Sequence, residues 1–233
     1  MFKYIIILTL IINFCNSFNI GNIKDFSENQ ISKAMDVIFK TNAVFASKTL
    51  VESSEGNVKP NVLLSQVDNA IYFYSPLTEE SALDLEKKLI SLNNRNLKEG
   101  TKNPIHLHIQ SFGGSLFHTL YLVDLIKNLE IPVYTYVDGF AASAGTLLSV
   151  SGKKRFITKN SIMLIHQLSS GVQGKFSEIQ DEFHNVETLM NIINDIYLEN
   201  SKLKIDELRE LLRHDLWLKS KECLKYGLVD EII

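Results

Sequence analysis

The chain has 233 residues, of which 45% are hydrophobic and 22% charged, a globular composition that supports one core. The formal net charge is −3, and no dense block of lysine and arginine occurs, so a nucleic-acid-binding surface is not supported. The two cysteines, Cys15 and Cys223, indicate no disulfide framework, because Cys15 lies in the first apolar run and Cys223 then has no partner.

The N-terminus has the pattern of a secretory signal peptide. A basic start, MFK, precedes the apolar run YIIILTLIINFC and the polar pair NS. A membrane-spanning helix needs about 20 apolar residues, so a retained anchor is the weaker interpretation. We expect residues 1–17 to be a signal peptide cleaved near Ser17, directing the chain to the secretory pathway or an organelle; the compartment itself stays unknown.

Residues 18–60 are expected to form a partly helical extension, with a helix at 29–48 and a loop at 53–61, ahead of one domain at 61–233. A strand from Asn69 and a helix at 78–94 come next, followed by a polar turn at 94–104. The segment PIHLHIQ at 104–110 alternates, which predicts a strand with Ile105, Leu107 and Ile109 on one face and two histidines on the other.

A βαβ unit follows. The turn SFGGS leads to a helix at 115–128 and a strand at 131–137, which predicts a parallel strand pair. The segment DGFAASAG at 138–145 opens an apolar helix. Strands at 154–157 and 161–165, helices at 175–201, 205–213 and 220–226, and the strand LVDEII complete the domain. The helix at 175–201 is longer than one small core requires, so it is a candidate for subunit contact.

Two neighbouring strand-to-helix turns are candidates for a site. Ser143 lies where a strand passes into a helix, so the amide of Ala144 is free to bind an oxyanion formed at that serine. Gly113 and Gly114 occupy the preceding turn, where Gly114 can supply a second donor. The alternatives are a tight packing corner with a serine cap and a plain glycine turn. Parallel strands place both turns at one edge of the sheet, which favours a site.

A serine nucleophile needs a base, and the chain has six histidines. His166 ends the apolar strand IMLI and opens onto a glycine-containing loop, which is typical of a residue at a site. The other five are more typical of solvated or hydrogen-bonded histidines: His106, His108, His118, His184 and His214.

Five ordered motifs carry a family resemblance: QSFGGS, GFAASAG, KKRFITKNSIMLIHQ, GVQGKFSEIQ and HDLWLKSKECLKYGLVDEI. Over residues 63–233 the chain resembles the proteolytic subunit of the Clp protease family. The resemblance implies an α/β fold, the ββα spiral of the Clp protease and crotonase superfamily, with a mainly parallel sheet and a protruding long helix. It implies Ser143 as nucleophile, His166 as base and Asp215 as the group that orients His166. Gly114 and Ala144 are the implied oxyanion donors.

The resemblance further implies a serine endopeptidase that cleaves unfolded proteins or peptides inside stacked rings of its own subunits, expected to be heptameric. It implies no cofactor or metal in this chain, and an AAA+ ATPase partner that alone uses ATP. Phe112 and Leu168 stand where the family usually has proline. Residues 18–60 match the family's N-terminal loops poorly, so the resemblance supports the ATPase partner less than the catalytic residues.

Three alternatives remain at this stage. A catalytically silent subunit of a mixed ring would keep the fold without activity. An acyl-CoA enzyme of the crotonase fold would use the paired amides but has no role for serine, histidine and aspartate in this order. A Ser/Lys peptidase would need one of three lysines near the serine: Lys153, Lys154 or Lys159.

Overall fold

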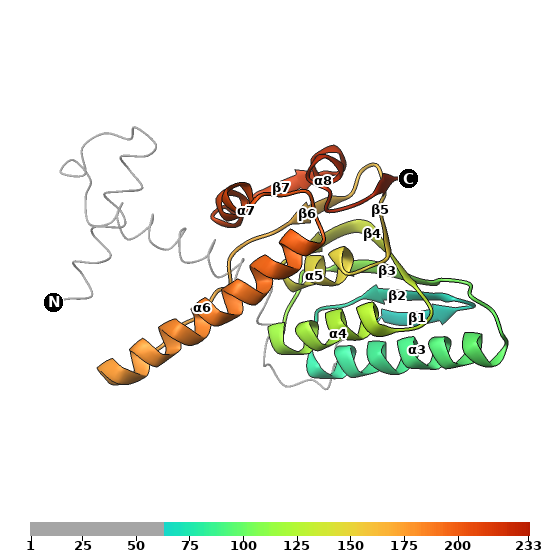
Figure 1. Ribbon diagram of the computed structural model, residues 1–233, viewed down its shortest axis with the longest axis horizontal. Helices are drawn as coiled ribbons and strands as arrows, with labels where there is room; N and C mark the ends of the chain where they lie inside the picture. Colours follow the sequence, from blue (N-terminus) through green and yellow to red (C-terminus); the bar gives the residue numbers. More distant parts are fainter. Residues whose placement is uncertain (1–62) are drawn as a thin grey trace, which may run out of the picture. The chain divides into compact units, whose positions relative to one another are not determined.

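The computed structural model describes residues 63–233. The signal segment and the helix and loop expected at 29–48 and 53–61 lie outside the described residues. The described part folds as an eight-stranded mixed sheet with helices packed against it (Figure 1). Its elements in chain order are β1 (Leu63–Val67), β2 (Ala70–Tyr74), α3 (Glu79–Lys98), β3 (Ile105–Ser111), α4 (Leu116–Asn128), β4 (Val133–Ala142), α5 (Ala144–Val150), β5 (Lys154–Ile157), β6 (Ile162–Leu164), α6 (Phe176–Glu199), α7 (Ile205–Leu212), β7 (Trp217–Lys219), α8 (Ser220–Tyr226) and β8 (Glu231–Ile232).

The sheet is mainly parallel, as expected. Its order is β1-β2-β3-β4-β5-β8, and β6 and β7 extend from the second half of β4. Strands β2 to β5, β6 and β8 pair in parallel, whereas β1 and β7 pair antiparallel with β2 and β6. The predicted βαβ unit is confirmed, since β3 and β4 pair in parallel and α4 connects them.

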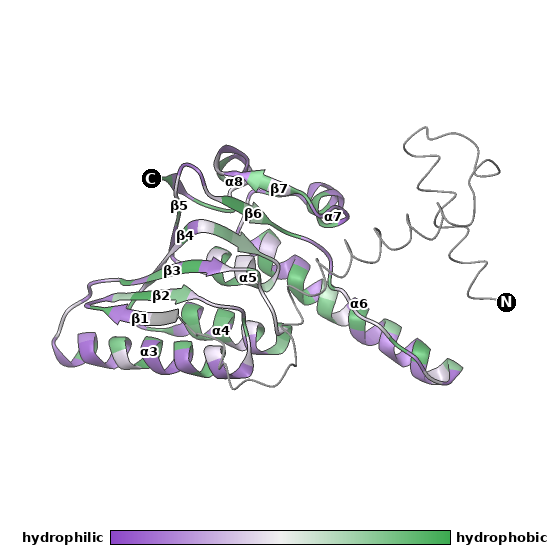
Figure 2. Cartoon of the chain, turned by 180° about the vertical axis from the view of Figure 1, so that it is seen from behind, coloured by the Kyte–Doolittle hydropathy of each residue, from purple (hydrophilic) through white to green (hydrophobic). Residues whose placement is uncertain are grey.

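Helices α3, α4 and α5 cover one face of this sheet, and α6 packs on α5 (Figure 1). Ile105, Leu107 and Ile109 of β3 are fully buried under them, whereas His106 and His108 are half-buried on the other face. Figure 2 shows the same division along α3, whose hydrophobic side faces the sheet. The alternation predicted for β3 is therefore confirmed.

Helix α3 is longer than the sequence predicts, because part of the expected polar turn at 94–104 is helical. Asn93 Oδ1 accepts a hydrogen bond from Ile131 N (3.1 Å), and Asn96 Nδ2 donates to Asn69 Oδ1 (3.1 Å). Both asparagines are buried. Tertiary hydrogen bonds thus extend the helix through residues whose intrinsic helix propensity is modest.

Strand β4 is also longer than predicted and runs to Ala142, so that helix α5 begins only at Ala144. Its first half pairs with β5 and its second half with β6. Neither β1 nor the three-residue strand β7 was predicted. Within residues 63–233, no helix is long and apolar enough to cross a membrane.

Candidate active site

Three strands that end at the same edge of the sheet position the candidate residues. Parallel pairing of β4 with β6 sets Ala142 opposite Leu164, and Ser143 N donates to Leu164 O at 2.9 Å. Antiparallel pairing of β6 with β7 sets Leu164 opposite Trp217. Continuing the second register by two residues brings His166 opposite Asp215. Residues separated by more than 70 positions in sequence thus lie on neighbouring strand ends.

Ser143 itself has a left-handed backbone, with φ 53° and ψ −128°. Such a conformation costs a non-glycine residue about 1–3 kcal/mol and persists only where surrounding contacts hold it. Here Ser143 O accepts hydrogen bonds from both Thr146 N (2.9 Å) and Thr146 Oγ1 (2.6 Å). The main chain is therefore fixed on both sides of the half-buried serine side chain.

His166 and Asp215 are close but not hydrogen-bonded. His166 Nδ1 lies 3.8 Å from Asp215 Oδ1, beyond hydrogen-bond range. The Asp215 side chain is 82% exposed, against 28% for His166. The hydrogen bonds of residues 63–233 include none between the Ser143 hydroxyl and His166. The single chain thus brings the three groups together without completing the hydrogen bonds that a catalytic triad requires.

The glycine turn after β3 packs directly on the serine turn. A Cβ on Gly113 would lie 2.8 Å from Ala144 N and 2.9 Å from Ser143 Cβ, so only glycine fits there. Gly114 forms a parallel bridge with Leu77, in which Leu77 N donates to Gly113 O and Ser115 N donates to Leu77 O. In that geometry the N–H of Gly114 points away from Leu77.

The Ala144 amide is a second backbone donor at this edge. Ala144 is the first residue of α5, so its N–H precedes the intrahelical hydrogen bonds. Two backbone donors from neighbouring turns beside a serine are the arrangement that stabilises an oxyanion in acyl transfer.

Comparison with known proteins identifies the family of this chain. The family model described as Clp protease matches residues 55–233. The chain belongs to the Clp protease family. It is similar to the ATP-dependent Clp protease proteolytic subunit of Deinococcus radiodurans, with 29% identity over 168 residues that cover 71% of this chain and 80% of the relative. It is 35% identical to proteolytic subunit 1 from Chlamydia pneumoniae over 167 residues, which cover 70% of this chain and 85% of the relative.

A solved structure supports the same assignment. A ClpP1 mutant from Listeria monocytogenes matches with a TM-score of 0.64 and 27% identity, covering 71% of this chain and 91% of the other. The mixed α/β fold with a mainly parallel sheet is therefore that of the Clp protease family. Membership of its proteolytic-subunit branch supports a serine-protease role.

The other histidines all have different neighbours. His106 Nδ1 contacts the Tyr136 hydroxyl (2.8 Å), and His108 Nδ1 contacts Asp138 Oδ2 (2.7 Å) on the face of the sheet opposite the buried Ile105, Leu107 and Ile109. His118 pairs with Ser115. The remaining two lie near glutamates on exposed helices: His184 near Glu187 and His214 near Glu210. His166 is thus the histidine that the strand register brings to the serine edge.

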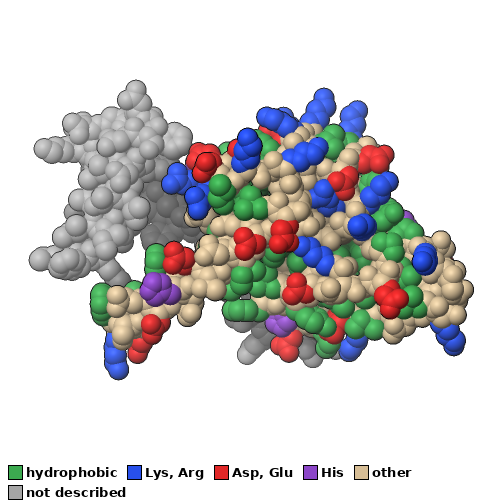
Figure 3. Space-filling view, in the orientation of Figure 1, with side chains coloured by type: hydrophobic (Ala, Val, Ile, Leu, Met, Phe, Trp, Pro, Cys, Tyr) green, Lys and Arg blue, Asp and Glu red, His purple; other side chains and the backbone are tan. Residues whose placement is uncertain are grey.

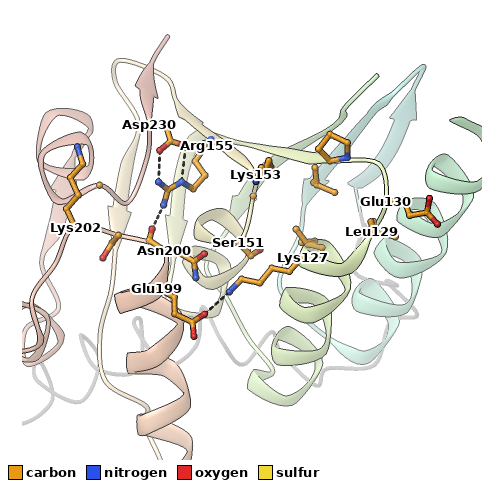
Figure 4. Close-up of a pocket in the computed structure, with 16 residues that line it drawn as sticks. Lys127, Leu129, Glu130, Ser151, Lys153, Arg155, Glu199, Asn200, Lys202 and Asp230 are labelled. Atoms are coloured by element: carbon orange, nitrogen blue, oxygen red, sulfur yellow. Dashed lines mark hydrogen bonds and ion pairs between the residues drawn. The ribbon is translucent and has the colours of Figure 1, made fainter. Parts of the chain in front are cut away.

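The lysines of the Ser/Lys alternative belong to other parts of the fold. Lys154 pairs with Tyr134 near the start of β4. Tyr134 is nine residues before Ser143, so at 3.3 Å per residue the two lie about 30 Å apart along the strand. Lys153 lines a pocket of about 630 Å³ at that same amino end of the strands (Figure 4). Lys159 N donates to Ile233 O beside β8. These positions favour a histidine base over a lysine.

The pocket in Figure 4 is itself a structural junction. Lys127 Nζ pairs with Glu199 (3.1 Å), and Arg155 Nη2 pairs with Asp230 (2.5 Å) while Arg155 Nη1 also donates to Asn200 O. These two ion pairs connect the ends of α4 and α6 and join β5 to the segment before β8. No group of three or more potential metal-ligating side chains occurs among residues 63–233.

Sequence reasoning missed two polar residues that support the site. Ser111 is 1% exposed, and its Oγ accepts a hydrogen bond from Gly113 N at 3.1 Å. The signal was present in the alternation of β3, because Ser111 continues the buried face of Ile105, Leu107 and Ile109. Thr146, fully buried in the first turn of α5, carried no comparable signal in the sequence.

Proposed function

We propose that the chain is a serine endopeptidase that hydrolyses peptide bonds of unfolded proteins or peptides. The observation that carries the proposal is the junction of β4, β6 and β7, where Ser143 follows one strand, His166 another, and Asp215 precedes the third. No cofactor is needed for this chemistry, since the nucleophile, the base and water complete the reaction.

In the proposed mechanism, Ser143 Oγ attacks the peptide carbonyl carbon while His166 accepts the hydroxyl proton. The amides of Gly114 and Ala144 stabilise the negative charge on the carbonyl oxygen. His166 then donates the proton to the leaving amine, which gives an acyl ester on Ser143. Water, deprotonated by His166, attacks the ester, releases the carboxylic acid and restores the serine. Asp215 holds the imidazole in the required tautomer.

A groove beside the site supports a polypeptide substrate. A pocket of about 620 Å³ begins at Ser115, the residue after Gly114. On its other side lie residues 168–170, just beyond His166. Apolar side chains from three segments line it: Leu116 and Phe117, Leu168, and Val186 and Leu189. We expect it to hold an apolar substrate side chain next to the bond being cleaved.

Assembly into stacked rings, heptameric in our expectation, is part of the proposal. Helix α6 projects from the sheet, and Figure 3 shows hydrophobic side chains exposed on it. Phe176 is 77% exposed and Phe183 is 66% exposed, which is unusual for a helix that stays in water. A copy packed on this helix would bury them. We also propose an AAA+ ATPase as the source of unfolded substrate, on the ground that both curated relatives are named ATP-dependent.

A catalytically silent subunit of a mixed ring is the second candidate. The 3.8 Å separation and the exposed Asp215 favour it, because neither is expected of an assembled catalytic site. In that case the chain would contribute its fold and α6 contacts to a ring whose other subunits carry the activity.

Labelling by a serine-directed fluorophosphonate tests the proposal. Purified full-length chain should react at Ser143 and hydrolyse a fluorogenic peptide. Ser143→Ala and His166→Ala should each lower hydrolysis by about 10⁶-fold, the loss found when such a residue is removed from a triad. Ser91→Ala, on the exposed side of α3, is the matched control and should keep full activity. Assembled rings that never label would exclude the endopeptidase and favour the silent subunit.

A further inference from the structure

A buried tyrosine of α6 is hydrogen-bonded to the first turn of α5, the helix that begins just after the candidate nucleophile. Tyr197 is 2% exposed, and Thr146 is fully buried. The Tyr197 hydroxyl lies 2.5 Å from Thr146 Oγ1. Neither residue belongs to the proposed reacting groups, and nothing in the proposed mechanism yet uses them.

The direction of these hydrogen bonds follows from counting protons. Thr146 Oγ1 donates its single proton to Ser143 O at 2.6 Å, so it can only accept from Tyr197. Burial raises the pKa of Tyr197 by more than the hydrogen bond with Thr146 lowers it, so the phenol keeps its proton at neutral pH. The chain of donors therefore runs from Tyr197 through Thr146 to the carbonyl of Ser143.

That carbonyl shares a peptide unit with the Ala144 N–H. A trans peptide is planar, with its C=O and N–H pointing in opposite directions. Fixing the direction of Ser143 O therefore fixes the direction of the Ala144 amide. The same hydrogen bonds withdraw electron density through the carbonyl, which makes the N–H a stronger donor.

We propose that Tyr197 and Thr146 are positioning residues that aim the Ala144 amide at the oxyanion. The inference rests on the proposed function, since it concerns the same serine. It also accounts for how the left-handed backbone of Ser143 is held, because two hydrogen bonds from Thr146 converge on its carbonyl.

An oxyanion forms only on the way through the transition state, so misaiming its donor lowers kcat and leaves KM unchanged. Tyr197→Phe removes one hydroxyl and keeps the ring, and we expect kcat and the labelling rate to fall roughly 3- to 10-fold, the effect of one hydrogen bond. Thr146→Val removes both links and should cost roughly 10- to 100-fold, less than the loss of a whole oxyanion donor. Thr146→Ser keeps the hydroxyl and should restore activity close to that of the original chain.

A matched control is available at the other end of the same helix. Ser151 is 5% exposed, and its Oγ donates to Leu148 O at 2.7 Å. Ser151→Ala should therefore lower stability by about as much as Tyr197→Phe while leaving kcat unchanged. The pH profile should stay the same in every variant, because the proton-transferring group is untouched.

The double variant Tyr197→Phe with Thr146→Val decides whether the tyrosine acts through the threonine. The inference requires kcat no lower than in Thr146→Val alone. The inference would be overturned if Tyr197→Phe lowered kcat in the Thr146→Val chain by as much as it does in the original chain. An unchanged kcat in Tyr197→Phe, or a higher KM in place of a lower kcat, would also overturn it. If the unaltered chain itself fails to label at Ser143, the proposed function is what fails.

Discussion

A single methyl group at Gly114 should disable the proposed oxyanion site. Gly114 has φ +147°, and a Cβ built there would lie 2.2 Å from Leu77 O and 2.9 Å from Leu77 C. Both atoms are backbone, so the turn itself must move. Gly114→Ala should therefore break the two hydrogen bonds between Leu77 and the glycine turn, at about 1 kcal/mol each. Backbone strain adds about 1–3 kcal/mol, so we expect a total loss of about 3–5 kcal/mol.

Two measurements check this prediction. Urea unfolding should show the loss of stability, and the rate of fluorophosphonate labelling should fall by about 10²–10³, the effect of losing one oxyanion donor. Gly100→Ala is the matched control, because Gly100 also has a positive φ of 66° but no atom lies within 4 Å of the added Cβ. It should cost only about 1–2 kcal/mol and leave labelling intact. Equal stability losses in the two variants would refute the steric argument. Normal labelling in Gly114→Ala would refute the role of the Gly114 amide as an oxyanion donor.

Three further predictions concern other parts of the chain. Burial raises the pKa of the Asp230 carboxyl, but the hydrogen bonds and charge of Arg155 lower it by more, so the net pKa lies below 3.8. Asp230→Asn should therefore destabilise the fold by about 1 kcal/mol at pH 7. Urea unfolding at several pH values should show this difference between the two chains vanish as the pH falls through the lowered pKa. Burial raises the pKa of Cys223 to about 12, so peptide mapping should find its thiol unmodified by iodoacetamide until the chain unfolds, and rapid labelling of the folded chain would contradict this. N-terminal sequencing of the mature protein should begin near Phe18, whereas retention of Met1 would exclude signal cleavage.

Much of the fold follows from local patterns. The alternation around His106 and His108 predicted β3 and its buried face, and the strand, helix and strand order predicted the parallel pair of β3 and β4. The long amphipathic helix at 175–201 matches α6 closely. These elements are predictable because side-chain periodicity alone decides which face is buried.

The features that escaped prediction depend on tertiary partners. Helix α3 continues past its predicted end at residue 94, where the Asn96 side chain donates to the distant Asn69, a contact that no local window reveals. The strand β7 is only three residues long and exists because β6 lies beside it. Its register sets Asp215 opposite His166, so the place of the third candidate residue came from the family resemblance and not from periodicity. The contact between Tyr197 and Thr146 spans 51 residues and has no local signature.

The three strand ends of the candidate site are held unequally, and this decides the order in which they open when the protein is heated. Strand β4 is paired along both edges, to β3 on one side and to β5 and β6 on the other, so opening it requires global unfolding. Asp215 and Leu216 lie on the exposed four-residue link, 213–216, between α7 and β7, and such segments open locally at low free energy. Amide hydrogen exchange should therefore be slowest along β4 and fast around Asp215. The proposed peptidase activity should then be lost on warming while the sheet is still folded, because the segment that holds Asp215 opens before the strand that holds Ser143 unfolds.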